Sequence, residues 1–526
     1  MVDQASLINL GKLVAIDVAA GRPGANAQVA SELVQATPGA VLDLIELVLT
    51  EVGNKHPNDR LISAFIFLIG EALQAIRYGV EAGHADAVAM ADRVRQTLLG
   101  DSGADPAMLL MILGQFSAAK LDPGPLLREK MGNLVEQVAT TLDFAADQDG
   151  VDSHISDLAK AARGDVFTFL DQMLEMAEPF PEDHRVQMIA SLLDSSEPIA
   201  REAVVGCLLD SSAEVRAAVA GLLERAAAHG LVSDVMLRRM ITMRNWLPRA
   251  SRAPLDRAID AGRRAGVACA SWPVAEVREV RASGIDGAGT QSVIVLSRDA
   301  RRSTMSSLLV KRGVGVRDVW TQRKMTKPQV RGMLEQIAGQ IDFYPVSIGY
   351  VRYLATHWLA INRESGVMPP FGMLGFLEAT GLSELQPEAV TIDGLLEHIA
   401  AAADPAQLKA HPEVDALLRS GDLLDVYPIL DSWFEDGDDV APLIRGKRRS
   451  RARLITTIRD RLLPIHRTKW AELLAWMALL LQSTPDQEHW IEFFAAARAL
   501  ADGRPIAEIP IMTVVAELTI TAFDDA

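Results

Sequence analysis

Apolar side chains recur at helical spacing through the first 240 residues of the chain. In residues 41–52 they return at every third or fourth position, as on one face of a helix. Breaks that contain proline or glycine, such as 38–40, 100–106 and 121–125, separate this segment from others of similar length. The pattern predicts a run of consecutive helices joined by short turns.

The clearest internal repeat lies at 192–223, where LLDSSEPIAREAVVGC is followed directly by LLDSSAEVRAAVAGLL. In the second copy Asp210 opens a turn, and Val215 and Arg216 follow on the predicted helix. This pattern resembles the helices of HEAT- and armadillo-type repeats, over residues 185–230 only. The resemblance implies an α-solenoid, in which stacked helix pairs bury their faces against one another and present an extended surface.

The pattern changes between residues 267 and 340, where β-branched and aliphatic runs alternate with turn signals. The Asp286-Gly287 pair is typical of a hairpin turn. We expect a three-stranded antiparallel meander here, followed by a helix at Val316–Arg323. A capped helix should then begin at Thr326.

From residue 341 the helical spacing returns. The segments expected to be helical are Tyr350–Asn362, Thr391–Ala402, Arg451–Leu463, Trp470–Gln482, Trp490–Ala501 and a last helix opened by Pro510. The sequence therefore predicts a mainly α fold: an α-solenoid with a small antiparallel β insertion and a C-terminal helical unit. Its expected regions are 1–240 (helical, HEAT-like), 241–340 (basic, with the small sheet) and 341–526 (helical).

The composition and the apolar segments of the chain indicate the compartment in which the protein is found. The cysteines are Cys207 and Cys269, without CxxC spacing, which excludes a disulfide framework and a structural zinc site. The N-terminus lacks the basic start and apolar stretch of a signal peptide. The most apolar windows, 61–70 and 470–481, are shorter than the roughly 20 residues that span a bilayer. We expect a soluble, cytoplasmic protein, and its abundant Arg, Ala and Gly, which have GC-rich codons, indicate a bacterial source.

No complete catalytic or metal-binding motif is present in the sequence. Acidic residues crowd residues 143–157, but a calcium loop with Gly150 at its sixth position would need acids where Ala145 and Ser156 stand. Neither HExxH nor GxSxG occurs, and His357 beside Trp358 is expected to be a packed residue. We therefore predict no catalytic residue, metal or cofactor, and a chain more typical of a non-enzyme.

The net charge of −17 is unevenly distributed. Residues 1–200 hold 29 acidic and 13 basic residues, whereas residues 201–340 hold 13 acidic and 23 basic ones. The remaining residues, 341–526, hold 27 acidic and 16 basic ones. This acidity argues against a general nucleic-acid coat protein, while the basic middle allows a local anionic partner.

The first candidate anion site surrounds Gly313-Val314-Gly315 and comprises Lys311, Arg312 and Arg317. A strand, a glycine turn and a helix N-terminus can hold a phosphate through backbone N–H groups. The dinucleotide fingerprint would need glycine at 318, where the chain has aspartate. A nucleotide site, a general anion contact and a plain tight turn all remain open at this point.

The second candidate is a cluster of cations in the C-terminal region. Its members are Arg445, Lys447, Arg448, Arg449, Arg451 and Arg453. A further Arg-rich stretch runs from Arg238 to Arg264. Clustered arginines can neutralise several phosphates and give salt-dependent binding, but neighbouring acids can also pair with them inside the fold.

Two functional hypotheses follow. The first is a non-enzymatic interaction or scaffold protein that holds a protein partner on an extended helical surface. The second is a HEAT-like nucleic-acid-binding protein that uses the Arg-rich patches. An enzyme centred on the 267–340 insertion is a third interpretation, and the sequence makes no prediction of the oligomeric state.

Overall fold

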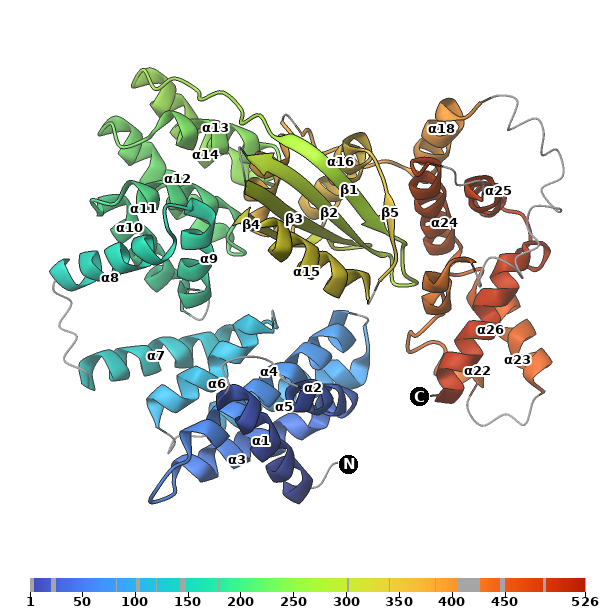
Figure 1. Cartoon of the computed structure of the whole chain (residues 1–526), viewed down its shortest axis with the longest axis horizontal. Helices are drawn as coiled ribbons and strands as arrows, with labels where there is room; N and C mark the ends of the chain where they lie inside the picture. The colour runs from blue at the N-terminus through green and yellow to red at the C-terminus, as the bar shows by residue number, and fades with distance from the viewer. Residues whose placement is uncertain are drawn as a thin grey trace. The chain divides into compact units, whose positions relative to one another are not determined.

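The computed structural model describes residues 4–525 except 20–24, 82, 101–104, 120, 142–147, 178–179, 300–301, 340, 384, 405–425, 445–449 and 486–488. The chain divides into two compact units, residues 1–200 and 201–526, and each is described by itself (Figure 1). The regions expected from the sequence, with boundaries near 240 and 340, remain predictions.

The N-terminal unit is built from helices, as the sequence predicts. They are α1 (Gln4–Ala19), α2 (Ala25–Ala36), η1 (Pro38–Ala40), α3 (Val41–Val52), α4 (Asp59–Glu81), α5 (Ala85–Gly100), α6 (Pro106–Ala118), α7 (Pro125–Thr141), α8 (Gln148–Ala161), α9 (Val166–Ala177) and α10 (Glu182–Asp194). Helix α11 (Pro198–Ala203) spans the border between the units.

Helix α4 is the centre of the N-terminal core. Its side chains Phe65, Leu68, Ile69 and Leu73 are buried and belong to one apolar cluster with residues of the neighbouring helices. Among the described helices, α4 alone is long and apolar enough to cross a membrane by itself, and the bent pair formed by α2 with η1 and α3 passes the same test together. A mostly buried helix at the core of a folded unit passes this test as well, and α4 has such a buried side.

The repeated sequence, residues 192–223, runs from the end of α10 across the border between the two units. Its first copy ends in η2 (Val204–Leu209), and its second forms α12 (Ala213–Ala228). Ser212 caps α12 by accepting a hydrogen bond from the Val215 N–H at 3.3 Å. Arg216 donates to the Asp210 carbonyl at 2.6 Å and to the Ser211 carbonyl at 2.9 Å. These hydrogen bonds stabilise the turn with which the second copy begins.

Two further helices, α13 (Asp234–Arg244) and α14 (Arg249–Arg264), complete this helical part. Helix α14 packs on both α12 and α13. The mainly α class is therefore confirmed, whereas the solenoid arrangement stays a prediction.

A five-stranded antiparallel sheet follows. Its strands are β1 (Glu276–Ser283), β2 (Thr290–Asp299), β3 (Arg302–Lys311), β4 (Gly315–Met325) and β5 (Phe343–Pro345), in the order β4-β3-β2-β1-β5. The antiparallel insertion and the hairpin between β1 and β2 are confirmed, but the sheet has more strands than the three expected.

The helix expected at Val316–Arg323 is wrong, because this segment is strand β4. Val316, Val319 and Trp320 have helical spacing in the sequence. In the sheet, Val310 pairs with Val316 while Leu309 pairs with Asp318, so one extra residue bulges out between them. This bulge interrupts the strand's two-residue alternation and makes it resemble a helix.

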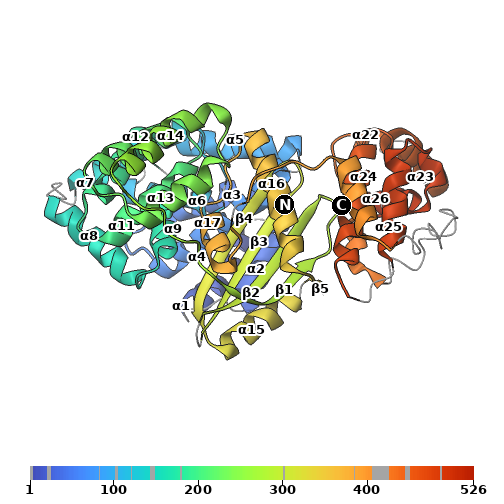
Figure 2. The same cartoon turned by 90° about the horizontal axis from the view of Figure 1, so that it is seen from above.

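Helices cover both faces of the sheet (Figures 1 and 2). Helix α15 (Lys327–Ala338), capped by Thr326 as predicted, packs through Val330, Met333 and Leu334 on a cluster formed by Ile294, Met305 and Met325. Helices α16 (Ile348–Ser365) and α17 (Gly372–Thr380) pack on the other face. The sheet is thus stabilised from both sides, which a small isolated sheet needs.

Asn362 of α16 fixes the β3–β4 turn. Its Oδ1 accepts from the Val316 N–H at 2.7 Å, and its Nδ2 donates to the Val314 carbonyl at 3.0 Å. Gly315 has φ +102°, and a Cβ there would lie 2.5 Å from the Asn362 side chain. Glycine is therefore required at this position.

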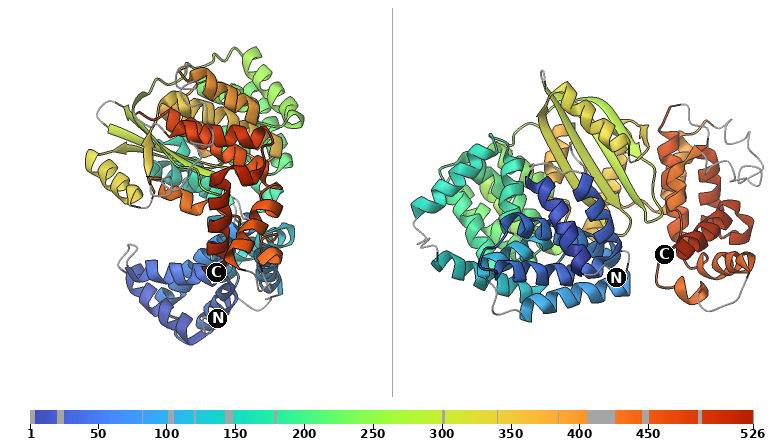
Figure 3. Two further views of the ribbon diagram at one scale, coloured as in Figure 1. Left: turned by 90° about the vertical axis from the view of Figure 1, so that its right-hand side faces the viewer. Right: turned by 60° about the horizontal axis from the view of Figure 1, so that its bottom comes forward.

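The remaining residues form the C-terminal helical part, drawn in orange and red in Figure 3. Its elements are α18 (Ile392–Ala402), η3 (Pro428–Ser432), α22 (Ala441–Ile444), α23 (Arg451–Thr457), the π-helical η4 (Ile458–Leu462), α24 (Arg467–Gln482), α25 (Trp490–Ala501), η5 (Ile506–Glu508) and α26 (Pro510–Asp525). The helices predicted from residue 341 onward are confirmed.

Candidate functional sites

The predicted anion site at 311–317 is a β-hairpin. Lys311 ends β3 and pairs with Gly315 of β4, so no helix begins at this glycine turn. The helix whose N-terminus was expected to hold a phosphate is a strand, and anion binding by these cations stays a prediction. The Nε atom of Arg312 lies 2.6 Å from the Glu472 carboxylate on α24, while Arg317 is the bulged residue of β4. Arg312 is therefore already paired with a carboxylate.

The structure describes only part of the C-terminal cation cluster. Arg445, Lys447, Arg448 and Arg449 lie outside the described residues. Arg451 donates to the Thr521 hydroxyl at 2.7 Å and lies 3.7 Å from Asp524. Arg453 is exposed on α23.

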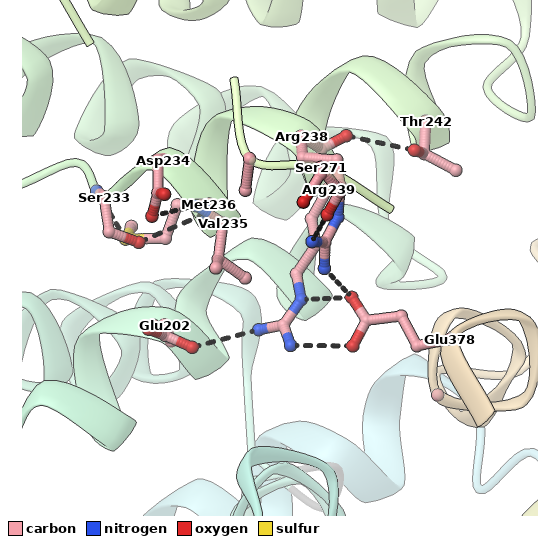
Figure 4. A network of polar contacts seen from close by, with 12 residues as sticks. Glu202, Ser233, Asp234, Val235, Met236, Arg238, Arg239, Thr242, Ser271 and Glu378 are labelled. Atoms are coloured by element: carbon pink, nitrogen blue, oxygen red, sulfur yellow. Dashed lines mark hydrogen bonds and ion pairs between the residues drawn. The ribbon is translucent and has the colours of Figure 1, made fainter. Parts of the chain in front are cut away.

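Many arginines of the basic middle region are paired inside the fold, and Figure 4 shows the most buried case. Glu378 of α17 accepts from Arg238 at 2.6 Å and from Arg239 at 2.9 and 3.1 Å. Arg239 also donates to Glu202 at 3.3 Å, and Arg238 donates to the Ser271 carbonyl at 2.8 Å. The side chains of Arg238, Arg239 and Glu378 are each less than a tenth exposed.

The electrostatics of this network favour the ionised carboxylate. Burial by itself would raise the pKa of Glu378, but the hydrogen bonds and positive charges of Arg239 and Arg238 outweigh it and lower the pKa. The network joins α13 to α17 and holds two arginines that the sequence offered for anion binding. They serve the fold instead.

Arginines on α13, α14 and α16 come together at a second place. Burial lowers the pKa of Arg252, and the positive charges of Arg244, Arg363 and Arg249 lower it further. Arg244 is paired with Asp256, and Arg252 donates to the Leu247 carbonyl at 3.0 Å. This group of arginines around Arg252 is the strongest remaining candidate for contact with an anionic partner.

The N-terminal unit exposes apolar side chains on its first two helices. Leu13 and Ile16 of α1 are 45% and 62% exposed, and Val29 and Leu33 of α2 are 61% and 41% exposed. Each pair lies on one side of its helix, beside the buried stripe, because the spacing is three or four residues. The two helices pack on each other. Sequence reasoning missed these residues, since an apolar residue on an amphipathic helix is normally assigned to the core.

A cavity of about 280 Å³ lies in the C-terminal unit. The β3–β4 turn, α16, the segment 389–392, α18 and α24 form its walls. Apolar side chains predominate on these walls, and a few polar groups lie among them. The lining side chains used below are Arg312, His357, Trp358, Ile361, Glu472 and Trp476.

His357 is a packed residue on this wall, in line with the expectation from sequence. Its Nδ1 accepts from the Val390 N–H at 3.0 Å, so the neutral ring carries its proton on Nε2. Burial lowers the pKa of His357 to about 4. Its ring centroid lies 5.0 Å from that of Trp476 and 4.7 Å from that of Trp358. The imidazole is therefore neutral at physiological pH.

We expect His357 to make the stability of the C-terminal unit depend on pH. Its pKa is lower in the folded chain, so unfolding takes up a proton between about pH 6.5 and 4, and stability falls as the pH falls through this window, by at most about 1.4 kcal/mol per pH unit. Urea unfolding followed by tryptophan fluorescence checks this, because all eight tryptophans lie between 246 and 490. In His357→Gln this part of the slope should be absent, and an unchanged slope would contradict the assignment.

No arrangement typical of catalysis is evident in the described part of the chain. No group of three or more His, Cys, Asp or Glu side chains there could hold a metal ion. Asp143 and Asp147 lie outside the described residues, and Asp149 and Asp152 lie on helix α8 rather than on a loop.

Comparison with known proteins relates the chain to an uncharacterised bacterial family. The Y4lR second domain matches residues 181–266, and the Y4lR C-terminal helical domain matches residues 393–524. The uncharacterized protein y4lR of Sinorhizobium fredii is 26% identical over 499 residues, which cover 92% of each chain. No solved structure matches.

Proposed function

We propose that this chain is a non-enzymatic, cytoplasmic interaction protein that binds a protein partner through its N-terminal unit. The observation that carries the proposal is the set of exposed apolar side chains on α1 and α2, namely Leu13, Ile16, Val29 and Leu33. Large apolar side chains gathered on an exposed surface are typical of protein contact sites. HEAT-like stacking of the helices within the N-terminal unit would extend this surface.

Charge narrows the class of partner. Residues 1–200 carry 16 more acidic than basic side chains. A second copy of this surface would bring two strongly negative units together, which electrostatic repulsion opposes. The partner that fits is a basic amphipathic helix. Its apolar face would contact the exposed apolar side chains of α1 and α2, and its cations would face the surrounding acidic residues.

Nucleic-acid binding is the second candidate, and the arginines around Arg252 favour it. Four arginines, Arg244, Arg249, Arg252 and Arg363, interact there. Against it, Arg244 is already paired with Asp256, and the described arginines Arg238 and Arg239 are buried in an ion network. We therefore rank this function second.

A defined probe tests the first proposal. Fluorescence anisotropy would measure binding of a fluorescein-labelled, helix-forming Leu/Lys peptide to the full chain and to the variant Ile16→Glu/Val29→Glu. Burying one such apolar side chain contributes about 1.5–3 kcal/mol, so we expect the variant to bind at least about tenfold more weakly. The variant is also two charges more negative, so attraction by charge alone would tighten binding instead.

The matched control is Val274→Glu, which makes the same change at a fully exposed valine of the C-terminal unit. It should leave the affinity for the peptide unchanged. If Ile16→Glu/Val29→Glu bound the peptide equally or more tightly, the exposed apolar side chains of α1 and α2 would not contact the partner helix.

A further inference from the structure

We infer that the cavity in the C-terminal unit is a binding site for a small, flat, uncharged ligand that carries a hydrogen-bond acceptor. This site lies in residues 285–476, separate from the helices α1 and α2, and the inference does not depend on the proposed partner surface.

The walls select an apolar, planar body. Trp358 and Trp476 stand with their ring centroids 5.9 Å apart and their planes 30° from parallel, and Ile361, Leu395 and Leu473 complete the apolar lining. Small-molecule sites typically combine such walls with a few placed polar groups. A volume of about 280 Å³ lies at the lower end of such sites, which suits one ring or two fused rings.

The charges on the walls select against an ion. Arg312 and Glu472 both line the cavity, and their side chains meet at 2.6 Å. The guanidinium and the carboxylate neutralise each other, so an anionic or cationic ligand would have to compete with an existing pair. An uncharged ligand leaves the pair intact.

The imidazole on the wall carries a donor without a partner, and the buried Nε1–H of Trp358 also has none in the described part of the chain. The Nδ1 of His357 accepts the Val390 N–H, which leaves the Nε2–H as a donor, and this donor has no hydrogen-bond partner among the described residues. His357 is 7% exposed and lines the cavity. A carbonyl or ring nitrogen of a ligand in the cavity would accept a hydrogen bond from this donor.

One segment that lines the cavity is held by the same histidine. Ala389, Val390 and Thr391 line both the cavity and an open groove that Tyr353 and His398 also border. The Val390 N–H donates to His357, and the neighbouring Glu388 N–H donates to the Thr356 carbonyl at 3.2 Å. The ligand would reach the cavity past this segment.

A matched probe series tests the inference on the full chain. Isothermal titration would compare 2-naphthamide with 2-naphthoate, 2-naphthylmethylammonium and 2-methylnaphthalene, which share the ring and differ in charge and acceptor. We expect 2-naphthamide to bind at least tenfold more tightly than the other three. Naphthoate or the ammonium probe binding as tightly would overturn the uncharged class, and equal binding of methylnaphthalene would overturn the role of the donor.

Two variants locate the site. Ile361→Trp adds bulk to the cavity wall and should abolish binding of 2-naphthamide, whereas Ile341→Trp, the same change at an exposed residue outside the lining, should leave it unchanged. His357→Phe keeps a ring but removes the donor, and should weaken naphthamide about tenfold without affecting methylnaphthalene. Unaltered binding in Ile361→Trp would contradict the site even if His357→Phe fails to fold.

Discussion

Replacing Glu378 with alanine should destabilise the C-terminal unit by about 3–5 kcal/mol, because it leaves two buried arginines without their carboxylate. Removing one partner of a buried ion pair costs more than the pair contributes, since the remaining charge is still desolvated. In urea unfolding followed by tryptophan fluorescence, we expect a midpoint lower by roughly 1 M or more.

Glu335→Ala is the control for this prediction. Its carboxylate lies 3.7 Å from Arg331 on α15, and both side chains are largely exposed. An exposed pair of this kind contributes only about 0.3–0.5 kcal/mol. A Glu378→Ala midpoint close to that of Glu335→Ala would show that the network of Figure 4 does not hold α17 to α13.

Acid should weaken the same network. The pKa of Glu378 is lower in the folded chain than in the unfolded one, so its contribution is fully present above the unfolded value, about 4.3. That contribution is lost as the pH falls through the folded value. The loss lies at lower pH than the onset of the His357 effect, which allows the two to be separated.

Gly287→Ala should be the second severe change, with an expected cost of about 2–4 kcal/mol. A Cβ at this position would lie 2.1 Å from the Ser432 carbonyl oxygen and 3.0 Å from the Trp433 Cα. Both are backbone atoms, which cannot rotate away. The β1–β2 hairpin would have to separate from η3, and the 2.7 Å bond from the Trp433 indole N–H to the Ile285 carbonyl would be strained. The tryptophan-reported urea midpoint measures the cost.

The same substitution at Gly332 provides the contrast. This glycine lies within α15, and a Cβ there would meet no atom within 4 Å. Gly332→Ala should stabilise the chain by about 0.5–1 kcal/mol, because alanine loses less backbone freedom in a helix. Similar effects at the two glycines would contradict the close approach of the hairpin to η3.

The sequence predicted the helices well, because their cues are local. Thr326 caps α15, Pro510 opens α26, and the Asp286-Gly287 turn joins two strands, as expected. Strand β4 was mistaken for a helix because the extra residue Arg317 bulges from the ladder and breaks the alternation. Whether a residue bulges depends on the partner strand, which a local pattern does not contain.

The sites could be predicted only in part. Arginine clusters were visible in the sequence, but their pairing was not, because Arg238 and Arg239 lie about 140 residues from Glu378 along the chain. The cavity was invisible for the same reason, since Arg312, His357 and Glu472 come from three separate elements. The spacing that reveals a helix face carries no information about which distant side chain completes a site.

The most direct test of the proposed protein partner is capture of that partner from the native host at moderate salt. The tagged full chain and the Ile16→Glu/Val29→Glu variant would each be used, with and without nuclease, and the eluates read by quantitative mass spectrometry and by absorbance at 260 and 280 nm. The proposal predicts a stoichiometric basic protein that survives nuclease and is lost in the variant. Material absorbing at 260 nm that disappears with nuclease and is equal in both chains would contradict it and favour nucleic-acid binding.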